Sequence, residues 1–201
     1  WRDAHLARMQ RGCEALGIAS PAADFLRAET DALIADCGRG VLKIIVTRGI
    51  GARGYAPPRH GPATLLLSLS DAPLPPPRDG LVLRWCATPL AIQPRLAGLK
   101  HLNRLEQVMA RAEWRDAEHA EGLMLDTSGR VIEGVFSNLF LVRDGELVTA
   151  DLSRCGVAGV MRAELLYQSE SQGIATPITE IRLEQLHQAN QVFVCNSIYG
   201  V

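Results

Sequence analysis

The sequence lacks a surplus of charge of either sign. Lysine and arginine together number 21 and aspartate and glutamate number 22, so the formal net charge is -1 at pH 7. Surfaces that bind nucleic acid or anionic membranes need a dense basic patch, and no block of basic residues occurs here. The longest apolar runs, such as residues 41–46 and 64–69, are strand-sized and too short to cross a bilayer. We therefore expect a globular protein without nucleic-acid or membrane partners.

Cysteine is scarce, and its spacing suggests no bonded pair. The five cysteines are odd in number, widely separated and never form a Cys-x-x-Cys pair. Reduced thiols in the cytoplasm are the simplest interpretation. No histidine makes a ligand-spaced pair with a cysteine or another histidine, so the sequence predicts no metal site.

Lysine is scarcer still, with only Lys43 and Lys100 in the chain. A lysine amine can lose its proton and form a Schiff base with a carbonyl, whereas an arginine guanidinium stays charged and cannot do so. Lys100 is therefore the first candidate for any amine or carbonyl chemistry. Apolar residues recur at helical spacing from Leu102 to about Glu113, so we expect Lys100 at or just before a helix start.

Hydrophobic periodicity predicts a mixed α/β (α+β) chain. Four prolines within residues 73–77 form a stiff connector, so we place a domain boundary there, between residues 1–74 and 75–201. An Asp144-Gly145 pair between two apolar runs predicts a hairpin turn. Helices are expected near residues 5–16, 25–37, 102–113 and 161–171, and strands near 41–47, 64–70, 81–87, 121–125, 131–136, 139–142, 147–149, 175–178 and 191–195.

A glycine-rich loop follows the strand expected at residues 41–47. Its glycines at positions 49, 51 and 54 match the dinucleotide-binding pattern, which requires a helix to begin at once. Pro57 and Pro58 argue against that helix, so we expect a loop and no nucleotide. Arg48 and Arg53 in this loop are candidates for an anionic substrate, with solvated loop arginines as the alternative.

Four features at the ends of separate elements suggest a cofactor site. Lys100 offers an amine, Glu133 a carboxylate, Ser197 a hydroxyl, and small residues at 156–162 precede a helix whose first N–H groups could hold a phosphate. Together they are the components that hold pyridoxal phosphate. The alternative interpretation treats each feature separately, as a surface lysine, an ion-paired glutamate, a capping serine and a packed turn.

Three segments resemble motifs of the fold type IV pyridoxal-phosphate enzymes: Gly98-Leu-Lys-His-Leu-Asn-Arg-Leu-Glu-Gln-Val108, Val131-Ile-Glu-Gly-Val-Phe-Ser-Asn-Leu-Phe140 and Gly156-Val-Ala-Gly-Val-Met-Arg162. The resemblance extends over nearly the whole chain, and the segment around Lys100 is most similar to the 4-amino-4-deoxychorismate lyases. It implies a homodimer with a small α/β domain at residues 1–74 and a larger, pseudo-barrel, cofactor-binding domain at 75–201. It also implies that the first strands of one domain and the last elements of the other are missing from this chain.

The resemblance assigns a role to particular residues. Lys100 would form a Schiff base with pyridoxal 5'-phosphate and then act as the proton-transfer base, while Glu133 would pair with the pyridine nitrogen. The other cofactor-binding positions would be Arg8, Asn138, Val160, Met161 and Ser197, and Arg48, Arg53 and Arg104 are candidates for the substrate carboxylates.

The function that the resemblance implies is a carbon–oxygen lyase of folate biosynthesis. It would convert 4-amino-4-deoxychorismate to 4-aminobenzoate and pyruvate. Two alternatives stay open: an aminotransferase for D-amino or branched-chain amino acids, and a non-catalytic relative of these enzymes.

Overall fold

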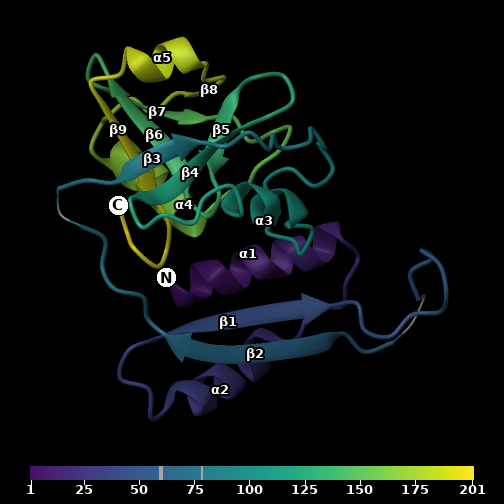
Figure 1. The fold of residues 1–201 in the computed structure, drawn as a ribbon. Coiled ribbons are helices and arrows are strands. Elements are labelled where there is room, and N and C mark those ends of the chain that lie inside the picture. The colour runs from purple at the N-terminus through teal and green to yellow at the C-terminus, as the bar shows by residue number, and fades with distance from the viewer. Residues whose placement is uncertain (59–60, 78) are drawn as a thin grey trace. The chain divides into compact units, whose positions relative to one another are not determined.

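The computed structural model describes residues 1–58, 61–77 and 79–201 (Figure 1). The chain divides into two compact units, Trp1–Leu74 and Pro75–Val201. The assignment of these units as a small α/β domain and a cofactor-binding domain stays a prediction. No helix in the described part of the chain is long and apolar enough to span a membrane.

The first unit combines two helices with a two-stranded antiparallel ribbon (Figure 1). Leu6, Cys13 and Leu26 are its buried apolar residues, and they come from the two helices. The strands pair along their whole length, from Gly40 opposite Asp71 to Thr47 opposite Thr64. The elements are α1 (Arg2–Ala15), α2 (Ala23–Ile34), β1 (Gly40–Thr47) and β2 (Thr64–Asp71).

The glycine-rich segment after β1 forms no helix between residues 48 and 58, as the two prolines predict. Arg48 at its start donates hydrogen bonds to the carbonyl oxygens of Leu16 and Gly17, just after α1 ends. A cation at this position satisfies carbonyls that lack partners inside the helix and complements the helix dipole. Arg53 lies in the exposed part of the loop.

The second unit is a seven-stranded mixed sheet with three helices (Figure 1). The strand order is β3-β4-β5-β6-β7-β8, and β9 pairs with β6. The β3–β4 and β7–β8 pairs are parallel, and the others are antiparallel. The elements are β3 (Val82–Trp85), α3 (Leu105–Arg111), β4 (His119–Leu125), β5 (Val131–Gly134), β6 (Asn138–Arg143), β7 (Glu146–Ala150), α4 (Val160–Ser171), β8 (Ile178–Thr179), α5 (Leu183–His187) and β9 (Gln191–Cys195).

The β6–β7 hairpin confirms the turn predicted from Asp144 and Gly145. Both residues have positive φ, 52° and 84°, and Arg143 pairs directly with Glu146 across the turn. A two-residue turn of this kind matches the right-handed twist of the strands.

The prediction around the lysine segment was wrong in one respect. The helix expected from residue 102 to about 113 is α3, which begins only at Leu105, so Lys100 lies in a loop five residues before it. Three apolar side chains of this helix do not face the core of the unit, because Leu105, Val108 and Met109 are 69%, 62% and 55% exposed. Helical spacing identified the helix, but tertiary contacts decide which of its faces is covered.

Two other boundaries differ from the prediction. The strand expected at 131–136 ends at Gly134, because the chain turns back at residues 135–137 to begin β6. The strand expected at 175–178 is reduced to β8, residues 178–179. Short-range alternation marks the strands but not where the chain leaves the sheet.

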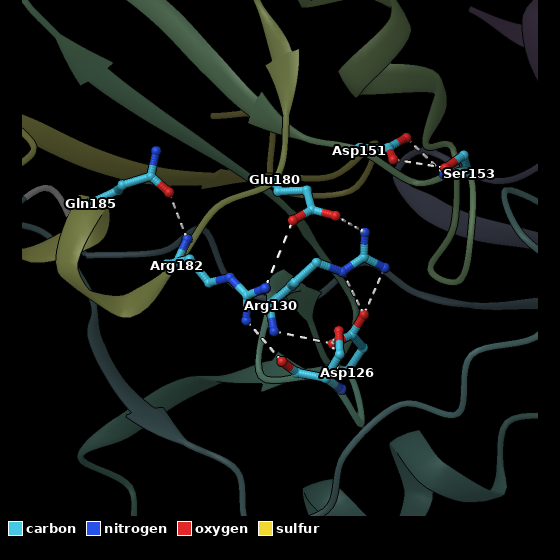
Figure 2. A network of polar contacts seen from close by, with 8 residues as sticks. Asp126, Arg130, Asp151, Ser153, Glu180, Arg182 and Gln185 are labelled. Atoms are coloured by element: carbon cyan, nitrogen blue, oxygen red, sulfur yellow. Dashed lines mark hydrogen bonds and ion pairs between the residues drawn. The ribbon is translucent and has the colours of Figure 1, made fainter.

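A network of ion pairs and hydrogen bonds surrounds the buried side chains of Arg130 and Asp126 (Figure 2). The Arg130 side chain is 1% exposed and donates from Nε to Oδ2 of Asp126 at 2.7 Å. Its Nη1 reaches Glu180 at 3.1 Å, and Arg182 donates to the carbonyl oxygen of Ser128 at 2.8 Å. These bonds tie the β4–β5 turn to the segment before α5.

Candidate active site

The segment Gly156–Gly159 is the point where three sequence motifs meet. The N–H of Gly98, two residues before Lys100, donates to the carbonyl oxygen of Gly156 at 2.9 Å. The N–H of Ala158 donates back to the carbonyl oxygen of Gly98 at 3.0 Å. The lysine segment is therefore held against the glycine-rich segment by a short parallel bridge.

Glu133 and Asn138 bind the same segment from the sheet. The N–H of Val157 donates to Oε2 of Glu133 at 2.8 Å, and Nδ2 of Asn138 donates to the carbonyl oxygen of Val157 at 2.8 Å. Glu133 and Asn138 face each other as a pair between β5 and β6. One residue, Val157, is thus bonded to both of the predicted cofactor residues in the sheet.

Gly156 and Gly159 make this close approach possible. Gly156 has φ +85°, and a Cβ there would lie 2.8 Å from a methyl carbon of Ile132 and 3.3 Å from Oε2 of Glu133. A Cβ at Gly159 would lie 2.2 Å from Oδ1 of Asn138, which accepts the Gly159 N–H at 3.1 Å. Only glycine lets the backbone come this near to the two side chains.

Glu133 is a buried carboxyl group, 3% exposed, whose pKa is raised to about 7. Burial is the main cause, because removing the group from water disfavours its charged form. The Val157 N–H and the charges of Arg104 and Lys100 oppose this rise, and the charge of Glu121 adds to it. One backbone donor and two cations therefore act on this carboxylate.

The N-terminus of α4 lies directly after this cluster. The helix begins at Val160 with Gly159 as its N-cap, and no side chain caps it. Among the described residues, no side chain accepts from its first N–H groups, and the positive end of the helix dipole adds to their attraction for an anion. The buried Arg162 donates to Ala150 O at 3.0 Å and Thr149 Oγ1 at 3.3 Å, which fixes the first turn against β7.

Ser197 lies just beyond β9, which pairs with β6 so that Cys195 is opposite Asn138. It is half-buried, in a turn closed by the Asn196–Gly200 bridge. Oδ1 of Asn196 accepts the N–H groups of Ile198 and Tyr199 at 2.8 and 2.9 Å. The same sheet therefore positions Ser197 and Asn138.

Three of the predicted arginines belong to the first unit. Arg8 is half-buried on α1, and burial lowers its pKa. Arg48 is bound to the carbonyls at the end of α1, and Arg53 is exposed. Their predicted roles toward phosphate and substrate remain predictions.

Two site-supporting residues, Glu121 and Arg162, were not predicted from the sequence. Glu121 is 1% exposed, and its carboxylate accepts bonds from the N–H groups of Gly122, Val135 and Phe136 and from the Ser137 hydroxyl. It thereby holds the turn that joins Glu133 to Asn138. The sequence signal that could have identified Glu121 was its charge within an otherwise apolar strand. For Arg162, the only signal was its place at the end of the segment 156–162.

Comparison with known proteins places this geometry in a family. The family model for class IV amino-transferases matches residues 1–201. The chain belongs to the class IV aminotransferase family. An aminodeoxychorismate lyase of Vibrio harveyi is 38% identical over 203 residues, which cover 99% of this chain and 74% of that protein.

Solved structures agree with this assignment. The 4-amino-4-deoxychorismate lyase of Pseudomonas aeruginosa superposes with a TM-score of 0.93 at 56% identity, covering 98% of this chain and 74% of that one. A branched-chain amino acid aminotransferase of T.th., solved with pyridoxamine 5'-phosphate, superposes with a TM-score of 0.82 at 21% identity, covering 96% and 66%. The latter likeness concerns the fold alone, which is that of the fold type IV enzymes.

The residues present fit a pyridoxal-phosphate cofactor. Such a cofactor needs a carbonyl-reactive amine, a carboxylate for its ring nitrogen and N–H donors for its phosphate. Lys100 and the uncapped start of α4 lie on segments joined through Gly98 and Ala158. Glu133, whose carboxylate is destabilised by burial, would be stabilised by a cationic ring nitrogen.

Proposed function

We propose that this protein is a pyridoxal-phosphate-dependent lyase that converts 4-amino-4-deoxychorismate to 4-aminobenzoate and pyruvate. The observation that carries the proposal is the convergence of the Lys100 segment, Glu133 and Asn138 on residues 156–159, directly before the uncapped helix α4. Two lyases of this name support it, the Vibrio harveyi protein at 38% identity and the Pseudomonas aeruginosa structure at 56%.

The chain's residues would hold the cofactor at three points. Glu133 would place its negative charge against the ring nitrogen, and Asn138 keeps the glycine-rich segment in place behind it. The N–H groups of Val160 and Met161 at the start of α4 would bind the phosphate, together with Ser197. Lys100 would be the point of covalent attachment through its amine.

Pyridoxal 5'-phosphate, when bound, supplies an electron sink for the electrons of the broken carbon–hydrogen bond. Once the substrate's amine has displaced Lys100 from the cofactor, the freed Lys100 amine would take the proton from the ring carbon that carries the substrate's nitrogen. The carbon–oxygen bond on the adjacent carbon then breaks: its electron pair leaves with the oxygen, the electrons of the carbon–hydrogen bond complete the aromatic ring, and the departing enolpyruvate takes up a proton to become pyruvate. Glu133, in its ionised form, would keep the ring nitrogen protonated throughout.

An aminotransferase activity is the second candidate. The matching family and the structure solved with pyridoxamine 5'-phosphate both carry that name. It predicts transfer of an amino group from D-alanine or L-leucine to a keto acid, with no pyruvate formed from aminodeoxychorismate. The lyase is favoured because the two lyases match this chain at 38% and 56% identity, whereas the aminotransferase structure matches it at 21%.

We further propose that the protein works as a cytoplasmic homodimer. The exposed apolar side chains of Leu105, Val108 and Met109 on α3 form a surface that a second copy would cover. All five cysteines are free thiols, which fits a reducing compartment. Light scattering of the purified protein tests the dimer, and a monomer at micromolar concentration would refute it.

The test of the proposed function uses the two lysines as a matched pair. Protein incubated with pyridoxal phosphate is reduced with borohydride and digested, and peptide masses then identify the modified residue. Before reduction, we expect visible absorbance from the bound cofactor, and after reduction and digestion we expect the cofactor mass on the Lys100 peptide. Both signals should be lost in Lys100→Ala and kept in Lys43→Ala. Lys43 is exposed on β1, so its removal leaves the site intact.

Activity is measured by coupling pyruvate release from aminodeoxychorismate to lactate dehydrogenase. We expect pyruvate from the wild type and from Lys43→Ala, and none from Lys100→Ala. Amino transfer to a keto acid without pyruvate would establish the aminotransferase instead. Equal cofactor labelling in Lys100→Ala and the wild type would refute the assignment of Lys100.

A further inference from the structure

Arg104 binds the backbone on both sides of Lys100. Its Nε donates to the carbonyl oxygen of His101 at 3.0 Å, and its Nη2 donates to that of Leu99 at 2.7 Å. Lys100 therefore lies between two peptide units that one guanidinium holds together. On the N-terminal side, Gly98 is fixed by its bonds to Gly156 and Ala158.

The same guanidinium also acts on Glu133: it binds Leu99, next to Gly98, and Gly98 is bridged to Val157, whose N–H donates to the Glu133 carboxylate. After the Val157 N–H, Arg104 is the main influence that lowers the pKa of Glu133, ahead of Lys100, while Glu121 and burial raise it. Arg104 is half-buried and follows Asn103, whose N–H donates to Nδ1 of His101 at 3.2 Å. Two of its nitrogens are therefore bound to the loop, and its charge is held at the site.

We propose that Arg104 is a positioning residue of the active site: it fixes the loop that presents Lys100 and supplies a permanent positive charge beside Glu133. This inference rests on the proposed function, which gives Lys100 and Glu133 their roles. It assigns Arg104 a task different from binding a substrate carboxylate.

Arginine suits this double task better than lysine. A planar guanidinium can donate to two carbonyl oxygens at once in a fixed geometry, and it stays charged at every physiological pH. A lysine ammonium at the same position keeps the charge but not the paired geometry. The variants Arg104→Lys and Arg104→Met therefore separate the clamp from the charge.

The clamp is tested on the cofactor-free protein by hydrogen exchange and mass spectrometry. In Arg104→Met, amide exchange in residues 99–103 should rise by about 10-fold, as expected when bonds from a charged donor are lost. The remainder of Pro75–Val201 should exchange as in the wild type. Arg104→Lys should also lose protection, while Arg95→Met is the control, because Arg95 is an exposed arginine of the same segment.

The charge is tested by the affinity for pyridoxal phosphate. Arg104→Lys should bind it within about 3-fold of the wild type, and Arg104→Met about 10-fold more weakly, because only the methionine variant leaves Glu133 without this cation. Arg95→Met should match the wild type in both measurements.

Several results would overturn the proposal. Unchanged exchange at residues 99–103 in both variants would refute the clamp, and equal cofactor affinities of the two variants would refute the charge. Faster exchange throughout the second unit would show a general structural role instead. A change in KM for aminodeoxychorismate alone would indicate a substrate ligand. If the wild type binds no cofactor, the proposed function fails, but the exchange comparison still decides the clamp.

Discussion

Replacing Glu133 by glutamine should stabilise the cofactor-free protein at alkaline pH while weakening its binding of pyridoxal phosphate. The pKa of the folded protein's Glu133 is raised from an ordinary value of 4.5 to about 7, chiefly by burial. Folding therefore favours the protonated form. The stability associated with this group is complete below about pH 4.5 and is lost as the pH rises through 7.

The size of the effect follows from these two values. At 1.36 kcal/mol for each pH unit between them, ionising the buried carboxyl costs roughly 3 kcal/mol at pH 8. Glutamine keeps an oxygen that can accept the Val157 N–H, but it does not ionise. The difference in unfolding free energy between Glu133→Gln and the wild type should therefore become more favourable to the variant by about 2.5 kcal/mol between pH 5 and pH 8.

The assay is urea unfolding without cofactor at the two pH values. Trp1→Phe serves as the background, so that fluorescence reports only on Trp85 and Trp114, which both lie in the second unit. Comparing the change between pH 5 and pH 8 cancels any pH-independent effect of the substitution. Glu146→Gln, an exposed residue of the same unit, is the control and should show almost no change.

Two results would contradict this reasoning. A stability difference that stays constant between pH 5 and pH 8 would mean that Glu133 does not titrate in this range in the folded protein. Unaltered affinity of Glu133→Gln for pyridoxal phosphate would mean that the carboxylate does not interact with the cofactor. The prediction is thus a gain in stability and a loss of binding from one substitution.

Three further predictions concern other parts of the structure. Arg130→Met should lower the unfolding free energy by about 3–5 kcal/mol, because it leaves a buried aspartate without its cation, whereas the exposed Arg182→Met should cost no more than about 1 kcal/mol in the same urea titration. Gly159→Ala should weaken cofactor binding at least ~10-fold, as measured by visible absorbance, because the added Cβ would lie 2.2 Å from Oδ1 of Asn138 and displace the start of α4. Cys37 should react first with a thiol reagent in the native protein, because the other four thiols are buried; faster reaction of any other cysteine would refute this.

The sequence alone determined the features that depend on short-range patterns. The order of helices and strands follows from periodicity, except for the short helix α5, which was not predicted, and the hairpin turn follows from Asp144 and Gly145, which tolerate positive φ. The absence of a helix after β1 followed from Pro57 and Pro58. The scarcity of lysine, together with the motifs around residues 100, 133 and 156, was sufficient to identify the family.

Tertiary structure alone decided which groups meet. Hydrophobic spacing identified α3, but not the exposure of Leu105, because burial depends on what packs against a face. Nothing local indicated that Glu121 would hold the turn between Glu133 and Asn138, because its partners lie 14 to 16 residues away. Arg104 was a plausible substrate ligand by charge alone. The fold brings its guanidinium to the two carbonyls beside Lys100, since a long flexible side chain binds whichever acceptors the backbone presents within its reach.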